Sequence, residues 1–443
     1  MQRTDSLALP VSTGDAAAVA AYEAALASFL PSTGDPLATI EAALAGDPEF
    51  VSGHVLRAGL AVAAWDKRSL PLLRSSLGAL VPLASTANER ESAHLAAARA
   101  WLAGEYRQAA DRYAACLRDW PGDLLALRLA QACDFFIGRS RGLLESVERV
   151  LPHWRPGVPG YEHVLAMHAF ALAENGAPAR AEEAGRKAVE LRPRHPFAIH
   201  AVAHALLEQG RVADGASWLE SRVADWATDS GLACHNWWHA ALFHLESGRI
   251  DRALGIFDRA FSPRANAVGL DAADASALLW RLRLEGVDVE ERWNAIADLW
   301  APRSADALWP LADLHALMAF AAAGRDAEAR SLVAFLAAAA KGRGETAAAV
   351  RDVGLPAARA IEAFAREQYG RAVDHLAPVH AALHRLGGSR AQREVLELTA
   401  LEAAIRAGEG RVARALVAEQ SRPAATTPRS RVQAARAAFV AAA

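Results

Sequence analysis

The stretch WWHAALFHLESGRIDRALGIFDRA, residues 237–260, is the clearest copy of a pattern that repeats along the chain. An apolar run that contains the small residue Ala241 precedes Gly248, and a second apolar run with Ala253 and the larger Phe257 follows it. Glycine commonly ends a helix where the backbone turns left-handed, so each copy predicts two helices joined by a short turn. One such pair cannot bury its apolar face alone, and neighbouring pairs must therefore stack.

The same glycine recurs at nearly constant intervals along the chain. Successive intervals are 34, 38, 34, 38, 38, 38, 46 and 38 residues. The glycines are Gly104, Gly138, Gly176, Gly210, Gly248, Gly286, Gly324, Gly370 and Gly408. An earlier unit is placed around Trp65 and Asp66, 38 residues before Gly104. This regularity predicts an all-α fold, an α-α superhelix of about ten helix pairs that is similar to a tetratricopeptide solenoid.

The repeat also predicts the domain organisation. We expect an N-terminal tail over residues 1–14, the helical array over 15–420, and a linker with a capping helix over 421–443. The longest expected interruptions are residues 262–269, 301–307 and 387–389. The segment SRPAATTPRS, residues 421–430, breaks the helical pattern before a last alanine-rich helix that would cap the array.

Composition excludes several classes of partner. The chain has 443 residues, 53% of them hydrophobic, and a formal net charge of -3 without a basic run, so nucleic acid and anionic membranes are poor candidates. No apolar run approaches the length of a membrane span, and the N-terminus lacks the pattern of a signal peptide. Three cysteines without CxxC spacing favour a reducing compartment. We therefore expect a soluble, cytoplasmic protein.

Two histidine pairs are the most informative polar feature. His200 and His204 form one pair, and His235 and His239 form the other, 35 residues further along the chain. Spacing of four residues places both imidazoles of a pair on one face of a helix. Because 35 residues is close to the repeat period, the two pairs should lie on equivalent helices of neighbouring units. Four histidines in one groove are difficult to explain by packing alone.

Other predicted first helices carry histidine or aspartate in similar positions, which extends the two pairs into a column. The additional members are His163, His168, Asp274, Asp313 and His315, with a weak extension to His94. Imidazole and carboxylate groups bind transition metals and also serve as general acids and bases. We predict His204, His239, Asp313 and His315 as ligands of a divalent transition metal. As catalytic groups we predict His200, His204, His235, His239 and Cys234.

Each of these residues also has a structural interpretation. A single histidine on a helix is usually a satisfied structural residue, and we interpret His375, His380 and His384 as such residues near the surface of a second helix. The thiol of Cys234 is either buried and inert or a nucleophile or ligand. A helix N-terminus lowers a thiol pKa, and His200 or His204 would be the base.

The stretch GGSRAQRE, residues 387–394, breaks one helix and begins the next. Ser389, Gln392 and Arg393 at a helix N-terminus predict either an anion site or an ordinary N-cap by Ser389. The chain contains none of the motifs GxxxxGK[ST], GxSxG, HExxH or CxxC.

Four stretches resemble the tetratricopeptide-repeat protein 38 family: HAVAHALLEQG (200–210), LACHNWWHAALFHLESGRIDRAL (232–254), DLHALMAFAAAGR (313–325) and GGSRAQRE (387–394). Residues 274–282, which begin at Asp274, also look like the corresponding segment of the family. The resemblance implies an α-helical array and brings no established reaction. It covers Asn236 and Trp238, which we predict as ligand-binding residues together with Asp274, Ser389, Gln392 and Arg393.

Two functions fit these observations. The first is a pocket protein whose histidine-rich cavity binds a small molecule or a metal ion and is an enzyme of unknown reaction, metal-assisted or dependent on histidine acid–base chemistry. The second is a scaffold whose groove binds a peptide or helix of another protein. The predicted first helices offer His, Asp and Trp with almost no Lys, which favours the pocket. A closed cavity with converging histidines would support the pocket, and a large open groove would support the scaffold.

Overall fold

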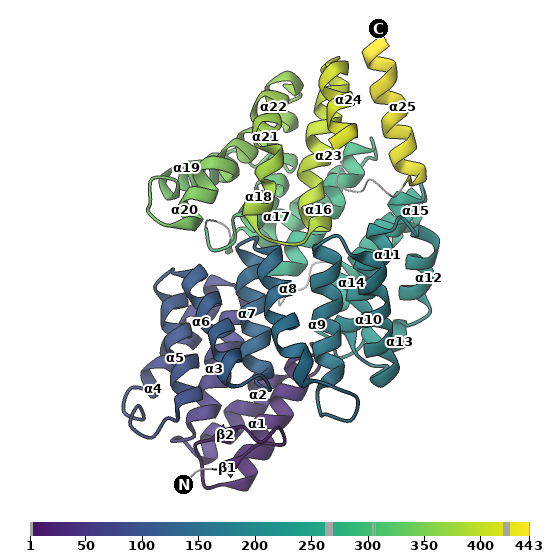
Figure 1. Ribbon diagram of the computed structural model, residues 1–443. Coiled ribbons are helices and arrows are strands. Elements are labelled where there is room, and N and C mark those ends of the chain that lie inside the picture. Colours follow the sequence, from purple (N-terminus) through teal and green to yellow (C-terminus); the bar gives the residue numbers. More distant parts are fainter. Residues whose placement is uncertain (1–2, 262–268, 304, 306, 420–425, 443) are drawn as a thin grey trace. The chain divides into compact units, whose positions relative to one another are not determined.

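The computed structural model describes residues 3–261, 269–303, 305, 307–419 and 426–442 (Figure 1). The prediction of an all-α fold is confirmed. Within the described ranges the strands are confined to a small antiparallel ribbon, in which β1 (Arg3–Thr4) pairs with β2 (Pro10–Val11). The chain divides into two compact units. Unit 1 comprises residues 1–205 and 224–233, and unit 2 comprises residues 206–223 and 234–443.

Unit 1 consists of the ribbon and a succession of antiparallel helix pairs. Its elements are α1 (Ala16–Phe29), α2 (Pro36–Gly46), α3 (Val51–Ala64), η1 (Lys67–Ser69), α4 (Leu70–Ala79), α5 (Glu89–Leu102), α6 (Tyr106–Asp119), α7 (Leu124–Phe136), α8 (Ser140–Val150), η2 (Leu151–His153), α9 (Tyr161–Glu174), α10 (Pro178–Leu191), most of α11 (Pro196–Glu208) and most of the short α13 (Val223–Trp226).

Unit 2 continues with the same kind of helix pair. Its elements are α12 (Val212–Glu220), α14 (Ala233–Glu246), α15 (Ile250–Ala260), α16 (Gly269–Leu284), α17 (Glu290–Trp300), α18 (Pro310–Ala322), α19 (Asp326–Ala339), α20 (Glu345–Ala349), η3 (Val350–Gly354), α21 (Leu355–Ala365), α22 (Tyr369–Leu376), η4 (Ala377–Leu386), α23 (Arg390–Arg406), α24 (Gly410–Glu419) and α25 (Pro428–Ala442).

The glycine markers end helices as predicted, with one exception. Gly104, Gly138, Gly176, Gly210, Gly248, Gly286, Gly324 and Gly408 all have positive φ, which places them in the left-handed region. The prediction was wrong at Gly370, which lies inside α22, and Glu367 with a φ of 59° takes the left-handed position instead. In the earlier unit Trp65 does so, with a φ of 45°.

First and second helices of a pair differ in burial. Every residue of α9 from His163 to Glu174 is buried, whereas α10 buries only a stripe of small and apolar residues, Ala181, Gly185, Ala188 and Val189. The small residues of the repeat allow close approach, since a Cβ on Gly185 would lie 2.6 Å from the Val202 side chain. Polar groups on a first helix are therefore desolvated, and each needs a partner in the protein or a ligand.

The predicted interruptions coincide with helix boundaries. Helix α15 ends at Ala260 and α16 begins at Gly269, with the intervening residues 262–268 outside the described ranges. The described residues between Trp300 and Pro310 are not helical, and residues 387–389 separate η4 from α23. Residues 421–425 of the expected linker, together with residue 420, also lie outside the described ranges, and α25 then begins at Pro428.

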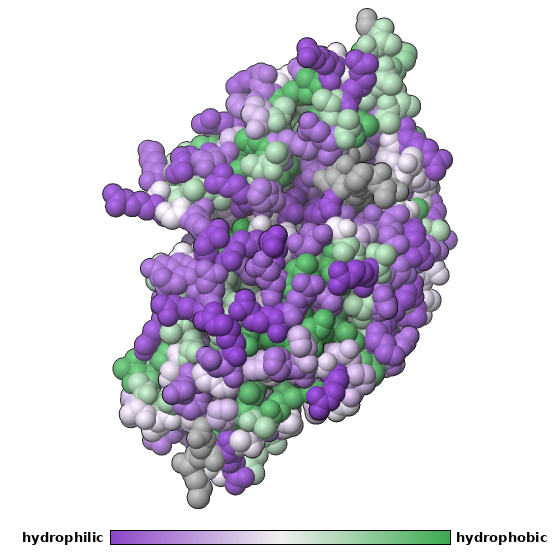
Figure 2. Space-filling model, viewed as in Figure 1, coloured by the Kyte–Doolittle hydropathy of each residue, from purple (hydrophilic) through white to green (hydrophobic). Residues whose placement is uncertain are grey.

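Hydrophilic residues predominate on the face shown in Figure 2, with apolar residues in smaller patches. The large hydrophobic side chains that are most exposed among the described residues include Phe439 and Val432 of α25 and Val81. None of the described helices combines the length and apolar character that a membrane span needs.

Candidate functional site

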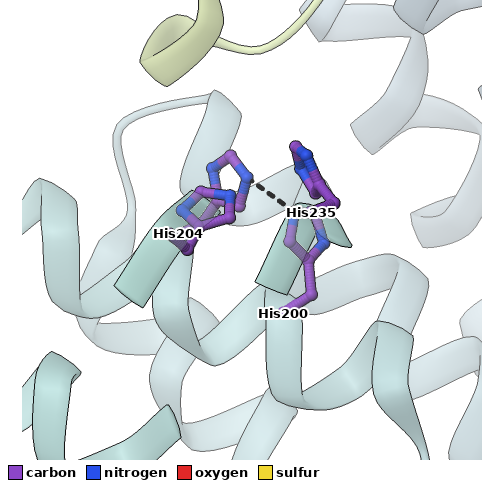
Figure 3. A group of neighbouring side chains, drawn as sticks. His200, His204 and His235 are labelled. Carbon is purple, nitrogen blue, oxygen red and sulfur yellow. Dashed lines mark hydrogen bonds between the residues drawn. The ribbon is translucent and has the colours of Figure 1, made fainter. Parts of the chain in front are cut away.

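The two predicted histidine pairs form one group. His200 and His204 come from α11 and His235 and His239 from α14, and one ring nitrogen of each lies within 4.8 Å of those of the others. Figure 3 shows the rings of His200, His204 and His235 gathered together. All four side chains are buried, with exposed fractions from 0% to 5%. We call this group the tetrahistidine cluster.

The α11 pair is held from one side by α9. The Nε2 atoms of His200 and His204 lie 2.9 Å apart, the hydrogen bond drawn in Figure 3. The Nδ1 atom of His204 faces Glu174 Oε1 at 3.4 Å, and both side chains are almost completely buried. The ring of Phe170 packs against His200 and His204, with centroids 5.6 Å and 5.1 Å away. A carboxylate only accepts hydrogen bonds, so Glu174 favours the proton on Nδ1 and leaves Nε2 of His204 as a lone-pair donor.

The α14 pair has an equivalent partner on α16. His235 Nδ1 donates to Asp274 Oδ2 over 2.7 Å, which again leaves Nε2 with the lone pair. Burial raises the pKa of the Asp274 carboxyl, while His235, Arg281 and a hydrogen bond from Gln392 act in the opposite direction. The Trp238 indole stacks on the His235 ring at a centroid distance of 5.3 Å and fixes its plane.

These contacts match the way proteins prepare histidine for metal binding. A ligating histidine usually donates its other N–H to a carboxylate or carbonyl, which fixes the tautomer and makes the ligating nitrogen more basic. His204 with Glu174 and His235 with Asp274 have this arrangement. The two carboxylates also place negative charge beside the imidazole rings, which favours a cation among them. The cluster therefore has the donor set and the supporting contacts of a transition-metal site.

The tetrahistidine cluster contains two of the four residues predicted as metal ligands, His204 and His239. The other two lie on α18. His315 Nδ1 donates to the Leu311 carbonyl over 2.7 Å, and burial lowers the pKa of this imidazole to about 4. Asp313 Oδ2 accepts from the Ala307 N–H over 2.9 Å. Both side chains are thus held by backbone partners, and their assignment as metal ligands stays a prediction.

The polar start of α23 forms a helix cap. Ser389 Oγ accepts from the Gln392 backbone N–H, and Gln392 Oε1 accepts from the Ser389 backbone N–H, which is a complete capping box. The Arg393 guanidinium donates to the carbonyls of Gly387 and Gly388. The N-cap interpretation of Ser389 is confirmed, and Gln392 additionally supports Asp274. These groups therefore position the α16 carboxylate and the loop before α23.

Three further predicted residues lie on α14. Cys234 is partly exposed, and its Sγ lies 3.7 Å from the Ala260 carbonyl. Asn236 is fully buried, and among the described residues neither amide atom of its side chain has a hydrogen-bond partner. The indole N–H of the buried Trp238 is in the same situation. An unsatisfied buried amide costs about 1 to 3 kcal/mol, so Asn236 is a candidate for contact with a ligand or a bound water.

Sequence reasoning missed Glu174. A repeat-level signal for it exists, because the residue two places before the glycine is glutamate in three successive units, Glu174, Glu208 and Glu246, all of them buried. Glu208 lies 3.3 Å from Arg390, and Glu246 accepts from Thr427 and Arg429. The position two residues before the glycine therefore places a buried carboxylate in each of these three units, where it pairs with a neighbouring cation or hydrogen-bond donor.

His195 was also missed, and it explains His163. The Ala198 backbone N–H donates to His195 Nδ1, so His195 caps α11 and carries its proton on Nε2. That N–H donates to His163 Nδ1 over 2.8 Å. Burial lowers the pKa of His163 to about 3 and that of His195 well below its usual value. Both rings are consequently neutral, and His163 has a structural partner instead of a place in the cluster.

A second group of metal-ligating atoms lies in unit 1. Single ligand atoms of His94, Cys116 and Asp123 also lie within 4.8 Å of one another, and all three side chains are buried. Asp123 Oδ2 accepts from His94 Nε2 at 2.8 Å and from Arg90 Nη1 at 3.0 Å, while Oδ1 accepts from the Ala126 N–H. Burial raises the pKa of the Cys116 thiol. We call this group the His94 cluster.

No family model matches the chain. The fold by itself does not assign a function either, because helical arrays serve many functions. The functional argument therefore depends on the tetrahistidine cluster and its surroundings.

Proposed function

We propose that the tetrahistidine cluster binds one divalent transition metal ion and that this protein is a metal-dependent small-molecule-binding protein built on a helical repeat. The observation that carries the proposal is the pair of buried carboxylates, Glu174 and Asp274, on the Nδ1 atoms of His204 and His235. Packing alone does not require a buried carboxylate behind each of two converging imidazoles.

The spacing within the α11 pair supports the same conclusion. Two nitrogens about 2.05 Å from one tetrahedral ion are separated by roughly 3.3 Å. The Nε2 atoms of His200 and His204 lie 2.9 Å apart, so a few tenths of an ångström separate the hydrogen-bonded pair from a chelating pair. An all-imidazole donor set suits zinc, copper, iron and nickel better than magnesium or calcium.

The coordination number would decide what the ion does. Four imidazoles complete a tetrahedral shell, whereas a metal that prefers six ligands would keep two positions for a bound molecule. In the second case the metal would act as a Lewis acid on a small molecule. Asn236 and Trp238 supply unsatisfied buried donors and an acceptor on the same helix for such a molecule. This arrangement supports metal-assisted chemistry as the more specific part of the proposal.

The relationship to the tetratricopeptide-repeat protein 38 family is likewise a proposal. Left-handed glycines at the repeat interval, and the matching position of Trp65 before them, support a tetratricopeptide-like array. The motifs of the resemblance include both histidine pairs of the cluster.

The test is a titration of protein that has been stripped of metal with a chelator. We expect zinc to bind with one ion per chain by calorimetry, and cobalt to give a visible absorption spectrum whose intensity distinguishes four from six ligands. His204→Gln with His239→Gln should abolish both responses, and His384→Gln, an exposed histidine, should change neither. Zinc and cobalt binding that the double variant retains would contradict the proposal.

A scaffold function has one supporting observation. A groove of about 320 Å³ lies along α21 and α22 in unit 2, and its lining includes Arg359, Arg366, Arg371 and His375. Its basic residues would suit an acidic peptide. Fluorescence anisotropy with a labelled polyglutamate peptide tests this function, and Arg359→Gln with Arg371→Gln should abolish binding. A peptide that does not bind the wild-type protein would remove this alternative.

A further inference from the structure

Arg128 is held in an unusual way in unit 1. It lies on α7, and the central carbon of its guanidinium lies over two aromatic rings, 4.9 Å from the Phe197 centroid and 5.8 Å from the Phe29 centroid. Phe29 is the last residue of α1, and Phe197 lies in the first turn of α11. Where a guanidinium contacts a ring through its face, its N–H groups, which lie in its plane, remain available to another partner.

The guanidinium has no carboxylate beside it among the described residues. Its Nε is buried without a hydrogen-bond partner, and burial lowers the pKa of Arg128 to about 10. Arg90 shows the ordinary alternative in the same unit, because its guanidinium donates to Asp123 at 3.0 Å. A desolvated cation without a counter-ion is costly, and such groups occur where a ligand completes the charge.

The surroundings of Arg128 define the kind of molecule that fits. Phe197, which packs on the guanidinium, also contacts the His200 ring at 5.8 Å and the Phe170 ring at 5.8 Å. Phe170 in turn packs against His200 and His204. An apolar wall therefore runs from Arg128 to the α11 half of the tetrahistidine cluster. One end of this wall offers a cation and the other end offers imidazoles.

We propose that Arg128 binds the carboxylate of a small molecule whose apolar or aromatic body lies along Phe197 and whose opposite end reaches the tetrahistidine cluster. The inference deepens the proposed function, and its second half rests on it. A single guanidinium edge matches the two oxygens of one carboxylate through parallel N–H bonds. A phosphate with nearly two charges would need further cations, and the nearby His163 and His195 are neutral.

Calorimetric titration with benzoate tests the carboxylate site. Benzoate should bind metal-stripped wild-type protein, and benzamide, which has the same ring but no charge, should bind about ten- to hundredfold more weakly. Arg128→Gln should produce the same loss for benzoate. Arg128→Lys keeps the charge without the planar fork and should bind with intermediate affinity. Arg186→Gln changes a partly exposed residue of α10 that is paired with Glu182; it is the control and should leave benzoate binding unchanged.

Several outcomes would overturn the proposal. Equal affinities for benzoate and benzamide would show that binding does not depend on the negative charge of the ligand. Inorganic phosphate that binds in preference to benzoate and depends on Arg128 would replace the carboxylate with a different ligand. Benzoate binding that persists in folded Arg128→Gln and Arg128→Lys variants, checked by circular dichroism, would assign the carboxylate to another part of the chain.

Metal-loaded protein separates this inference from the proposed function. The connection to the cluster predicts that isonicotinate (pyridine-4-carboxylate), whose ring nitrogen lies opposite its carboxylate, binds more tightly with zinc present than without it. If zinc does not bind at all, the proposed function fails while benzoate binding to Arg128 still stands. If zinc binds and the affinities with and without it are equal, the connection between Arg128 and the cluster is wrong.

Discussion

The tetrahistidine cluster and the His94 cluster satisfy the same distance criterion but differ in how their ligand atoms are used. In the His94 cluster, Asp123 already accepts from His94, from Arg90 and from the α7 backbone, and the Cys116 thiol is kept protonated by burial. In the tetrahistidine cluster, carboxylates lie at the Nδ1 atoms of His204 and His235, so Nε2 carries the lone pair in each, and that of His204 lies against His200 Nε2 within the group. Proximity of ligand atoms is therefore not sufficient for a metal site, and the second hydrogen bond of each ligand decides between the two.

The largest expected effect is loss of the metal. His204→Gln with His239→Gln removes one imidazole from each pair and should reduce metal content from one ion per chain to none. Cys116→Ser removes a ligand atom of the His94 cluster and should leave the metal content unchanged. Elemental analysis of the purified variants measures both. The comparison between the clusters would be reversed if Cys116→Ser lost the metal and the double histidine variant retained it.

The second effect concerns stability. Asp123→Ala leaves the guanidinium of Arg90 buried without its carboxylate and also removes the cap of α7. We expect this variant to lower the free energy of unfolding by roughly 3 to 5 kcal/mol. Asp123→Asn keeps the cap and should cost less. Urea denaturation followed by circular dichroism gives the values, and a loss below about 1 kcal/mol for Asp123→Ala would show that the His94 cluster is not a structural network.

Another buried carboxylate, that of Asp134, has fewer partners than Asp123 to compensate the cost of its desolvation. Asp134 of α7 lies 3.3 Å from Arg139, and burial raises its pKa to about 7. Because the folded pKa lies above the unfolded value of about 3.9, the native state binds the proton more tightly between these values. The contribution of Asp134 to stability is therefore most favourable below about pH 4 and is lost progressively up to about pH 7.

Asp134→Asn tests this pH dependence. The variant should gain stability relative to the wild-type protein as the pH rises from 4 to 8, by up to about 4 kcal/mol if no other group compensates. Urea denaturation of both proteins at several pH values gives the difference. A difference that is constant over this range would mean that the pKa of Asp134 is not raised in the folded protein.

The smallest expected effect tests the carboxylates behind the histidines. Glu174→Gln and Asp274→Asn keep all four imidazoles, and each should weaken metal binding about tenfold to hundredfold. Glu148→Gln is the matched control, because Glu148 lies 3.7 Å from His168, which is not in the cluster. Calorimetric titration with zinc measures the affinities. Equal affinities for all three variants would show that the carboxylates do not prepare the histidines.

The fold and the grouping of the four histidines could both be predicted from the spacing of residues in the sequence. Spacing of four residues places a histidine pair on one helix face, and the glycine period places two such pairs on equivalent helices. Glu174 was accessible to the same reasoning, because glutamate recurs two residues before the glycine in three successive units. At the unit of Gly370 the rule failed, since Glu367 adopts the left-handed conformation that glycine normally provides.

Other parts of the site depend on tertiary packing and leave no trace in spacing. His195 precedes α11, and only the packing of α9 against that loop brings it to His163. The environment of Arg128 is set by Phe29 and Phe197, which are far apart in the sequence. Asp313 and His315 follow the column in sequence, but backbone partners near them hold both side chains. Periodicity thus predicts which residues share a face, and it does not predict which hydrogen bonds they form.

The most direct test of the central claim is the metal content of the wild-type protein, purified without chelators and then reconstituted with zinc, iron, nickel or copper. We expect one transition-metal ion per chain, together with X-ray absorption that reports imidazole nitrogens as the nearest ligands. Protein that binds no transition metal even after reconstitution would contradict the account, and the four histidines would then be a hydrogen-bonded element of the core.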